Sequence, residues 1–88
     1  MIHPPLPFDD FRAELADAFG VPTSTLAAET DFFQDLAFDS IRMVELGMFF
    51  ERLGVEMPTE LAWDIQTVGN AYDYYVRESN AAATQPER

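Results

Sequence analysis

The residue best suited to chemistry in this sequence is Ser40, which follows Asp39 where a loop changes to a helical pattern. Asp39 suits the N-cap position, because its carboxylate can accept a hydrogen bond from an amide of the first helical turn that has no intrahelical partner. A helix N-terminus also offers free N–H groups and a positive dipole end, and both favour a phosphate there. From these residues alone, Ser40 is best interpreted as a second capping hydroxyl beside Asp39, at a helix end whose chemistry would also suit a phosphate.

Ser40 lacks the partners of an activated nucleophile. A catalytic serine needs an adjacent base, but the single histidine is His3, in a proline-rich segment, and the chain has no lysine. There is no Gly-x-Ser-x-Gly elbow and no cysteine, so thiolate nucleophiles and thiolate metal sites are excluded. No Asp-x-Asp-x-Asp-Gly loop with a distal glutamate is present. We therefore expect neither an enzyme nor a dedicated metal site.

The helix expected over residues 40–53 has two apolar faces. One stripe consists of Met43, Leu46, Phe50 and Leu53, and the other, on nearly the opposite side, of Ile41, Val44 and Met48. A surface helix normally has one apolar face, so a second one indicates either burial on both sides or a surface that meets partners. Charged residues border the second stripe, namely Glu45, Glu51 and Arg52. This border favours the partner interpretation.

The region around Ser40 resembles a known signature. Leu36-Ala37-Phe38-Asp39-Ser40-Ile41, followed by Val44-Glu45-Leu46, is similar to the acyl carrier protein signature, in which a leucine and usually a glycine precede Asp-Ser-Leu. Residues 30–36, 54–58 and 65–68 resemble the blocks that flank this signature in the family, in the same order. The resemblance covers roughly residues 8 to 77.

The resemblance implies a prosthetic group and a set of enzymes. Ser40 would accept phosphopantetheine from coenzyme A through a phosphodiester, made by a separate phosphopantetheinyl transferase, and Asp39 would help that transferase or its metal to engage. The thiol of the arm would carry intermediates as thioesters to enzymes acting in trans, such as a ketosynthase or an acyltransferase. A chain without cysteine could handle thioesters in this way.

The resemblance also implies a docking surface, with apolar residues at its centre and charged residues at its rim. Its expected members are Ile41, Arg42, Val44, Glu45, Met48, Glu51 and Glu56. The alternative for each acidic residue is an ordinary solvated face. A further possibility is an acyl-chain pocket lined by Leu46, Phe50, Trp63 and Ile65, although Trp63 is more simply interpreted, with Tyr72 and Tyr75, as part of the core.

Three departures from the family pattern bear on the pathway. Ala37 stands where a glycine is usual, Arg42 and Arg52 interrupt the acidity of the helix, and the Phe49-Phe50 pair is bulky. They favour a free-standing carrier of a polyketide or related specialised pathway over a primary fatty-acid carrier. The alternatives are a free-standing peptidyl or aryl carrier of a nonribosomal peptide pathway, and an unmodified helical adaptor that only binds proteins.

The 88 residues predict one small all-α domain, a four-helix bundle of three longer helices and one short helix. We expect an extended lead over 1–6, the domain over 7–78 and a flexible tail over 79–88. Pro7 would occupy the first position of the first helix, which Gly20 ends. Thr30, Thr59 and Thr67 would cap the later helical segments. Residues 21–39 would form a long loop pinned by Leu26 and the Phe32-Phe33 pair.

The charge and hydropathy of the chain limit its partners. Sixteen acidic residues against five arginines give a net charge of −11, which disfavours nucleic acids and anionic membrane surfaces. It fits a protein that meets basic partner surfaces, or acidity that serves only solubility. The sequence has no apolar run of membrane-spanning length and no signal-peptide pattern. We expect a cytoplasmic monomer without membrane insertion.

Overall fold

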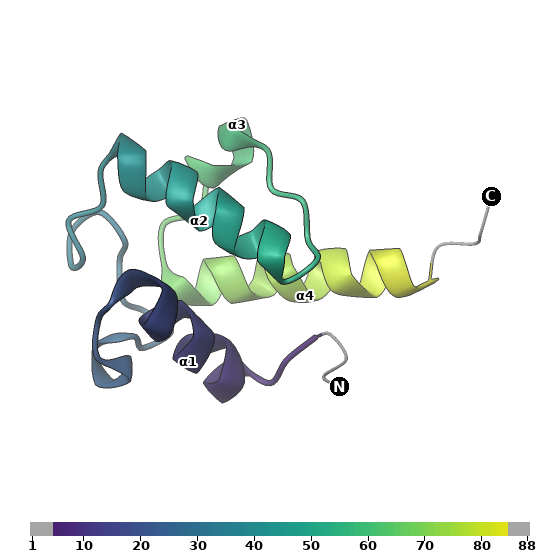
Figure 1. The fold of residues 1–88 in the computed structure, drawn as a ribbon, viewed down its shortest axis with the longest axis horizontal. Coiled ribbons are helices and arrows are strands. Elements are labelled where there is room, and N and C mark those ends of the chain that lie inside the picture. The colour runs from purple at the N-terminus through teal and green to yellow at the C-terminus, as the bar shows by residue number, and fades with distance from the viewer. Residues whose placement is uncertain (1–4, 85–88) are drawn as a thin grey trace.

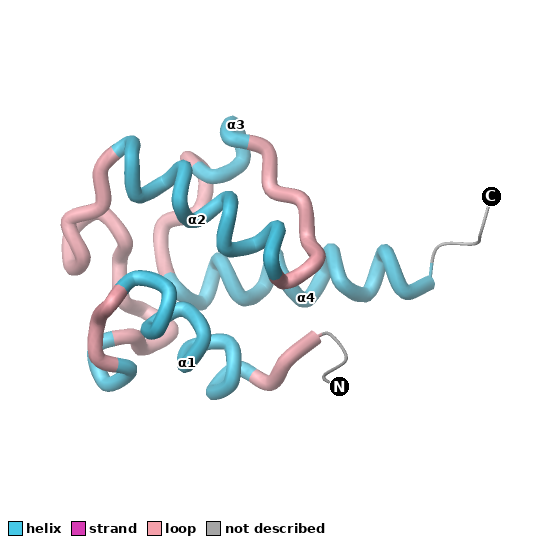
Figure 2. The backbone as a smooth tube through the Cα atoms, viewed as in Figure 1, coloured by secondary structure: helices cyan, strands magenta, loops and turns pink. Residues whose placement is uncertain are grey.

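The described part of the chain folds into four α-helices around one core (Figure 1). The computed structural model describes residues 5–84, with the backbone alone for Thr59 and residues 81–84. The helices are α1 (Phe8–Phe19), α2 (Ser40–Arg52), α3 (Thr59–Ala62) and α4 (Val68–Thr84), and the loop after α1 contains a 3-10 turn, η1 (Thr23–Thr25). The predicted all-α fold with three longer helices and one short helix is confirmed for the described residues. Figure 2 shows the long loop between α1 and α2 gathered at one end of the molecule.

Aromatic residues from three helices and the long loop fill the core. Phe11, Phe32, Phe50 and Tyr75 are at most 1% exposed. The ring centroid of Phe11 lies 5.3 Å from that of Tyr75, in a stacked arrangement. Pairs of this kind add about 0.5–1.5 kcal/mol beyond the area they bury. The apolar stripe of α1 faces this core, with Phe11, Leu15 and Phe19 buried.

The N-terminus of α4 explains why the long loop is ordered. The first amides of a helix have no intrahelical partner. In α4 the N–H of Val68 donates to the carbonyl of Thr30 at 3.0 Å, and that of Gly69 donates to the carbonyl of Ala28 at 2.8 Å. Thr67 and Asn70 complete the cap reciprocally, since each side chain accepts from the other's N–H. The predicted Thr67 cap is confirmed, and the loop is tied to α4 by backbone hydrogen bonds.

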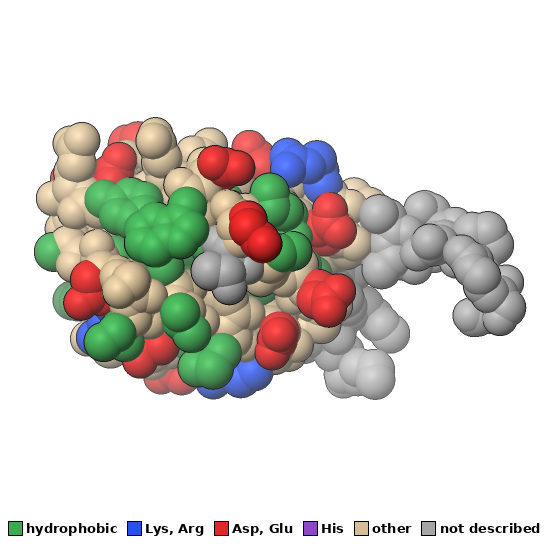
Figure 3. Space-filling model, turned by 90° about the horizontal axis from the view of Figure 1, so that it is seen from above, with side chains coloured by type: hydrophobic (Ala, Val, Ile, Leu, Met, Phe, Trp, Pro, Cys, Tyr) green, Lys and Arg blue, Asp and Glu red, His purple; other side chains and the backbone are tan. Residues whose placement is uncertain are grey.

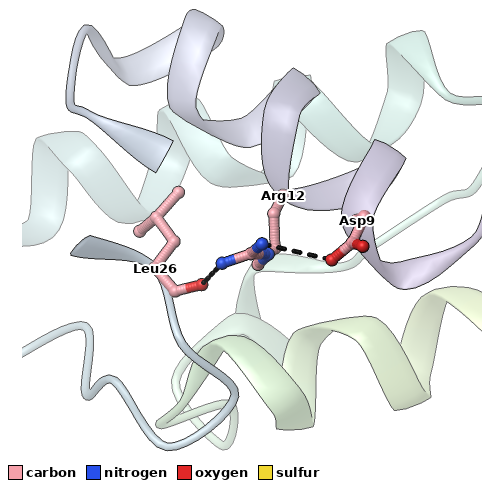
Figure 4. Close-up of polar contacts among 3 residues, drawn as sticks. All are labelled: Asp9, Arg12 and Leu26. Atoms are coloured by element: carbon pink, nitrogen blue, oxygen red, sulfur yellow. Dashed lines mark hydrogen bonds and ion pairs between the residues drawn. The ribbon is translucent and has the colours of Figure 1, made fainter. Parts of the chain in front are cut away.

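Arg12 joins α1 to the same loop (Figure 4). Its Nη1 donates to the carbonyl of Leu26 at 3.1 Å, and its Nη2 pairs with the Asp9 carboxylate at 3.1 Å. The guanidinium also lies over the Phe8 ring, 5.5 Å from the centroid. This arginine, which sequence reasoning did not single out, connects the first turn of α1 with the segment that follows η1.

The caps differ from the sequence-based expectation at three positions. Pro7 is the N-cap of α1, one residue before the first helical position. The Thr30 hydroxyl bonds within the preceding turn, and Asp31 accepts from the amides of Phe33 and Gln34 in its place, because its carboxylate can accept two hydrogen bonds at once. Pro58 is the N-cap of α3, and the side chain of Thr59 lies outside the described residues.

The tail expected over 79–88 begins within a helix. Helix α4 continues to Thr84, and Ser79 is buried at 6% exposure. The alanines at 81–83 favour helix and no breaker precedes Pro86, so propensity extends the helix beyond its apolar stripe. Residues 85–88 lie outside the described residues, as do residues 1–4 of the lead.

The described end of the lead is anchored. Leu6 is buried, its N–H donates to the Tyr75 hydroxyl at 2.8 Å, and its carbonyl accepts from the Tyr72 hydroxyl at 2.7 Å. Residue 6 therefore belongs to the packed domain. None of the described helices is both long enough and apolar enough to cross a membrane.

Candidate functional site

The loop reverses direction just before α2 and places Ser40 at the helix start. The N–H of Phe38 donates to the carbonyl of Phe32 at 2.9 Å, which closes the turn. Ala37 has a φ of 55°, a left-handed conformation that residues with a side chain adopt at a cost. Asp39 is the N-cap: its backbone is extended and its Oδ1 accepts from the Arg42 N–H at 3.0 Å. The predicted Asp39 cap is confirmed.

The Ser40 side chain is exposed at the first position of α2. Within residues 5–84 its hydroxyl forms no hydrogen bond, and neither does the N–H of Ser40 or of Ile41. Capping is therefore performed by Asp39, and the serine hydroxyl stays accessible. Two free amides beside an exposed hydroxyl at a helix N-terminus fit a phosphodiester, whose oxygens can accept from them. The Asp39 carboxylate would repel a phosphate bound there, but only weakly, because it is exposed and water and salt screen its charge.

The outward face of α2 carries an apolar stripe. Ile41 is 67% exposed, and Val44 and Met48 are each 54% exposed. The opposite stripe faces the core, with Met43, Leu46 and Phe50 at most 1% exposed and Leu53 packed at its edge. Helix α2 is therefore buried on one side only. Three exposed apolar side chains in a row form a surface of the kind that binds other proteins.

Paired charges flank this stripe on the side of α1. The Arg42 Nη1 lies 3.1 Å from the Glu45 Oε1, and the Arg42 guanidinium lies 5.5 Å from the centroid of the Phe19 ring. The two charges largely cancel, and an exposed pair of this kind contributes about 0.2–1 kcal/mol. A groove of about 610 Å³ runs beside them between α1 and α2, and Met48 lines it. Phe19, a core residue that is 8% exposed, also lines it.

The other predicted docking residues are acidic and exposed. Glu51 lies on the last turn of α2, and Glu56 follows it in the connection to α3. The backbone carbonyl of Glu56 accepts from the Tyr74 hydroxyl at 2.6 Å, which holds this connection against α4. The carboxylates themselves face solvent, so they are available to a basic partner.

The four residues of the predicted acyl pocket do not share one environment. Leu46 and Phe50 are fully buried, Ile65 is 6% exposed and Trp63 is 48% exposed. The interpretation of Trp63 as a core residue is wrong, whereas that of Tyr75 is confirmed and Tyr72 is half-buried. Helix α3 is one turn long and ends at Ala62, so Trp63 lies at its C-cap and outside any longer apolar stripe that would predict its burial. The pocket stays a prediction.

Two tyrosines of α4 have raised pKa values. Burial is the largest cause that raises the pKa of Tyr72, and of Tyr74, above the ordinary tyrosine value. Both hydroxyls stay protonated at neutral pH and donate to backbone carbonyls. Within residues 5–84, no group of three or more histidines or acidic residues lies close enough together to hold a metal ion.

Comparison with known proteins places these features in context. A family model described as "Phosphopantetheine attachment site" matches residues 9–75. An acyl carrier protein of Rubrobacter xylanophilus is 43% identical over 67 residues, which are 75% of this chain and 83% of that protein. An acyl carrier protein of Helicobacter pylori strain G27 is 38% identical over 68 residues, 76% of this chain and 87% of that protein. An acyl carrier protein of Helicobacter acinonychis is 35% identical over 68 residues, which are 76% of this chain and 87% of that protein.

Proposed function

This chain belongs to the acyl carrier protein family of phosphopantetheine-attachment domains, and from that premise we propose that Ser40 is the residue that carries its arm. As a member of the family the chain is a carrier and not an enzyme. The observation that supports Ser40 most strongly is its exposed hydroxyl, which is not used for capping because Asp39 accepts the capping hydrogen bond. A phosphopantetheinyl transferase can therefore reach it without unfolding α2.

Attachment needs an acceptor hydroxyl that a separate enzyme activates. The Ser40 oxygen attacks the β-phosphorus of coenzyme A, a phosphodiester forms, and 3′,5′-adenosine bisphosphate leaves. A base of the transferase would accept the serine proton, and its metal would stabilise the charge on the leaving phosphate. The chain would contribute the position of the hydroxyl and the free N–H groups of Ser40 and Ile41, which could donate to a phosphodiester at this helix start. Asp39 fixes the helix start and offers a carboxylate to the transferase-bound metal.

The test of Ser40 is intact-protein mass spectrometry after incubation with coenzyme A and a promiscuous transferase. The unchanged chain should gain the mass of one arm, and Ser40→Ala should gain none. Ser24→Ala is the matched control, since Ser24 is also exposed and lies in η1, and it should load normally. If Ser40→Ala still gained an arm, another residue would be the site. If the unchanged chain gained none, the unmodified adaptor would replace the carrier.

The outward face of α2 is proposed to dock the transferase and the enzymes that load and process cargo. Its apolar stripe supplies contact area, and Arg42, Glu45, Glu51 and Glu56 supply the charged rim. Glu45→Lys should slow loading at low salt, because it places a second cation beside Arg42 where a basic partner approaches. The control is Glu14→Lys on α1, which changes the net charge equally at an exposed site outside α2. Equal slowing in both variants would refute docking at this face.

For the pathway, we propose a free-standing carrier that delivers intermediates in trans in the cytoplasm, in a polyketide or fatty-acid-like specialised pathway. The Arg42–Glu45 pair supports this, because it neutralises one part of a helix that is more uniformly acidic in primary fatty-acid carriers. Loading assays with acyl and aminoacyl donors test the proposal. Selective loading by acyl donors supports it, and selective loading by aminoacyl donors would identify a peptidyl or aryl carrier.

A further inference from the structure

An aromatic pair, the exposed Trp63 and the partly buried Phe33, lies outside the helix that carries Ser40. The rings of Phe33 and Trp63 stack with 5.9 Å between centroids and an angle of 13° between planes. Trp63 remains 48% exposed, although large aromatic side chains usually bury most of their surface. Stacking restricts the rotamers of both rings, so the indole is held in place while part of it stays open to solvent. A rigid exposed tryptophan loses little side-chain entropy when it binds a partner.

The pair joins two segments that the tertiary structure fixes together. Phe33 follows Phe32, whose N–H donates to the carbonyl of Gln66 at 2.8 Å, three residues after Trp63. The N–H of Phe33 itself donates to the Asp31 carboxylate at 2.7 Å. The aromatic pair therefore sits on a hydrogen-bonded framework that connects the long loop with the segment after α3. It does not depend on a mobile side chain alone.

The two segments that form the pair carry acidic side chains and no basic ones. No arginine or lysine lies between Arg12 and Arg42, or between Arg52 and Arg77, so neither segment that forms the pair contains a cation. Three exposed acidic residues neighbour the two rings in the chain, namely Asp35, Glu60 and Asp64. Figure 3, which views the side of α2 and α3, shows apolar groups with acidic side chains among them and basic side chains only towards the edges. An aromatic surface in such a field attracts a cation.

We propose that Phe33 and Trp63 form an aromatic shelf that binds an arginine side chain of a basic partner protein. The face of tryptophan is the best aromatic acceptor for a cation. The planar guanidinium can stack on the indole while it donates to a neighbouring carboxylate, which a lysine ammonium cannot do in the same geometry. The shelf is distinct from the apolar stripe of Ile41, Val44 and Met48, and it does not depend on modification of Ser40.

Trp63 is the single tryptophan of the chain, so its fluorescence reports on the shelf directly. The probes are a short oligoarginine peptide and an oligolysine peptide of equal length, titrated at low salt into the full chain. Oligoarginine should change the Trp63 emission and bind several times more tightly than oligolysine. Equal affinity for the two peptides would show attraction by net charge alone and would overturn the proposal.

The variant Trp63→Leu keeps every charge and removes the indole. Calorimetry should show about 2–5-fold weaker oligoarginine binding, the size expected for one exposed cation–π contact. Leu61→Ala, which removes an exposed apolar side chain from α3, should bind like the unchanged chain. Circular dichroism verifies that each variant is folded. Unchanged affinity in Trp63→Leu, or an equal loss in Leu61→Ala, would refute the shelf.

Discussion

Two helical glycines have opposite surroundings and should respond in opposite ways to the same substitution. A Cβ atom added at Gly69 would lie 2.9 Å from the carbonyl oxygen and 3.3 Å from the Cβ of Ala28. The same N-terminal turn donates the Gly69 N–H to that oxygen at 2.8 Å. In Gly69→Ala the loop and α4 must separate, which stretches this hydrogen bond. At Gly47 the added Cβ would meet the carbonyl oxygen of Met57 at 3.7 Å, an ordinary contact.

The magnitudes follow from these distances. For Gly69→Ala, overpacking against backbone costs about 1–3 kcal/mol, and a weakened hydrogen bond adds about 1 kcal/mol. The better helix propensity of alanine returns up to about 1 kcal/mol, so the net loss is about 1–3 kcal/mol. Gly47→Ala meets no clash and should gain about 0.5–1 kcal/mol. At roughly 4–8 °C per kcal/mol for a domain of this size, the two Tm values should move well apart.

Thermal unfolding followed by far-ultraviolet circular dichroism measures both changes, and urea titration gives the free energies of unfolding. Gly69→Ala should lower Tm and Gly47→Ala should raise it. The comparison contrasts a close tertiary contact with an ordinary one, because the same substitution is made in a helix at both sites, in the first turn of α4 and in the interior of α2. A Gly69→Ala chain as stable as the unchanged one would refute the close approach of the loop to α4.

Three further predictions concern the turn, the pH dependence and the outward face of α2. Ala37→Gly should raise the free energy of unfolding by about 1 kcal/mol in urea titration, because glycine adopts the positive φ of 55° without strain; a loss would contradict it. Burial raises the pKa of Tyr74, so the stability that its neutral hydroxyl contributes is complete below pH 10.0 and is lost as the pH rises above it. Tyr74→Phe should lower Tm at neutral pH, because the hydrogen bond to the Glu56 carbonyl is lost. It should also make the fall of Tm above pH 10.0 less steep, and an unchanged slope would show that Tyr74 does not cause that fall. Ile41→Ala, at a 67% exposed position, should change the free energy of unfolding by less than about 0.5 kcal/mol. Met43→Ala, at 1% exposure, should lower it by about 2–5 kcal/mol. Similar losses in both variants would place Ile41 in the core.

Local patterns were enough to predict much of the site. The Asp39 cap, the helix that starts at Ser40 and the division of α2 into two stripes depend on residues within a few turns of each other. Neighbouring side chains on a helix keep a fixed spacing wherever the helix packs, so their grouping can be read from the sequence. The choice between burial on both sides and an open face required the structure, because it depends on which other segments cover α2.

Tertiary structure also decided the features that link distant segments. Trp63 follows a helix of only one turn, whose pattern does not indicate which side chains are buried. Its position depends on stacking with Phe33, which comes from the long loop. The carbonyl of Ala28 meets the amide of Gly69 across a wide separation in the chain, and nothing in either local pattern indicates it. The sequence alone thus determined the longer helices, the caps at Asp39 and Thr67, and a serine at a helix start, because these depend on short-range spacing. The structure decided what lies exposed, since burial depends on long-range contacts.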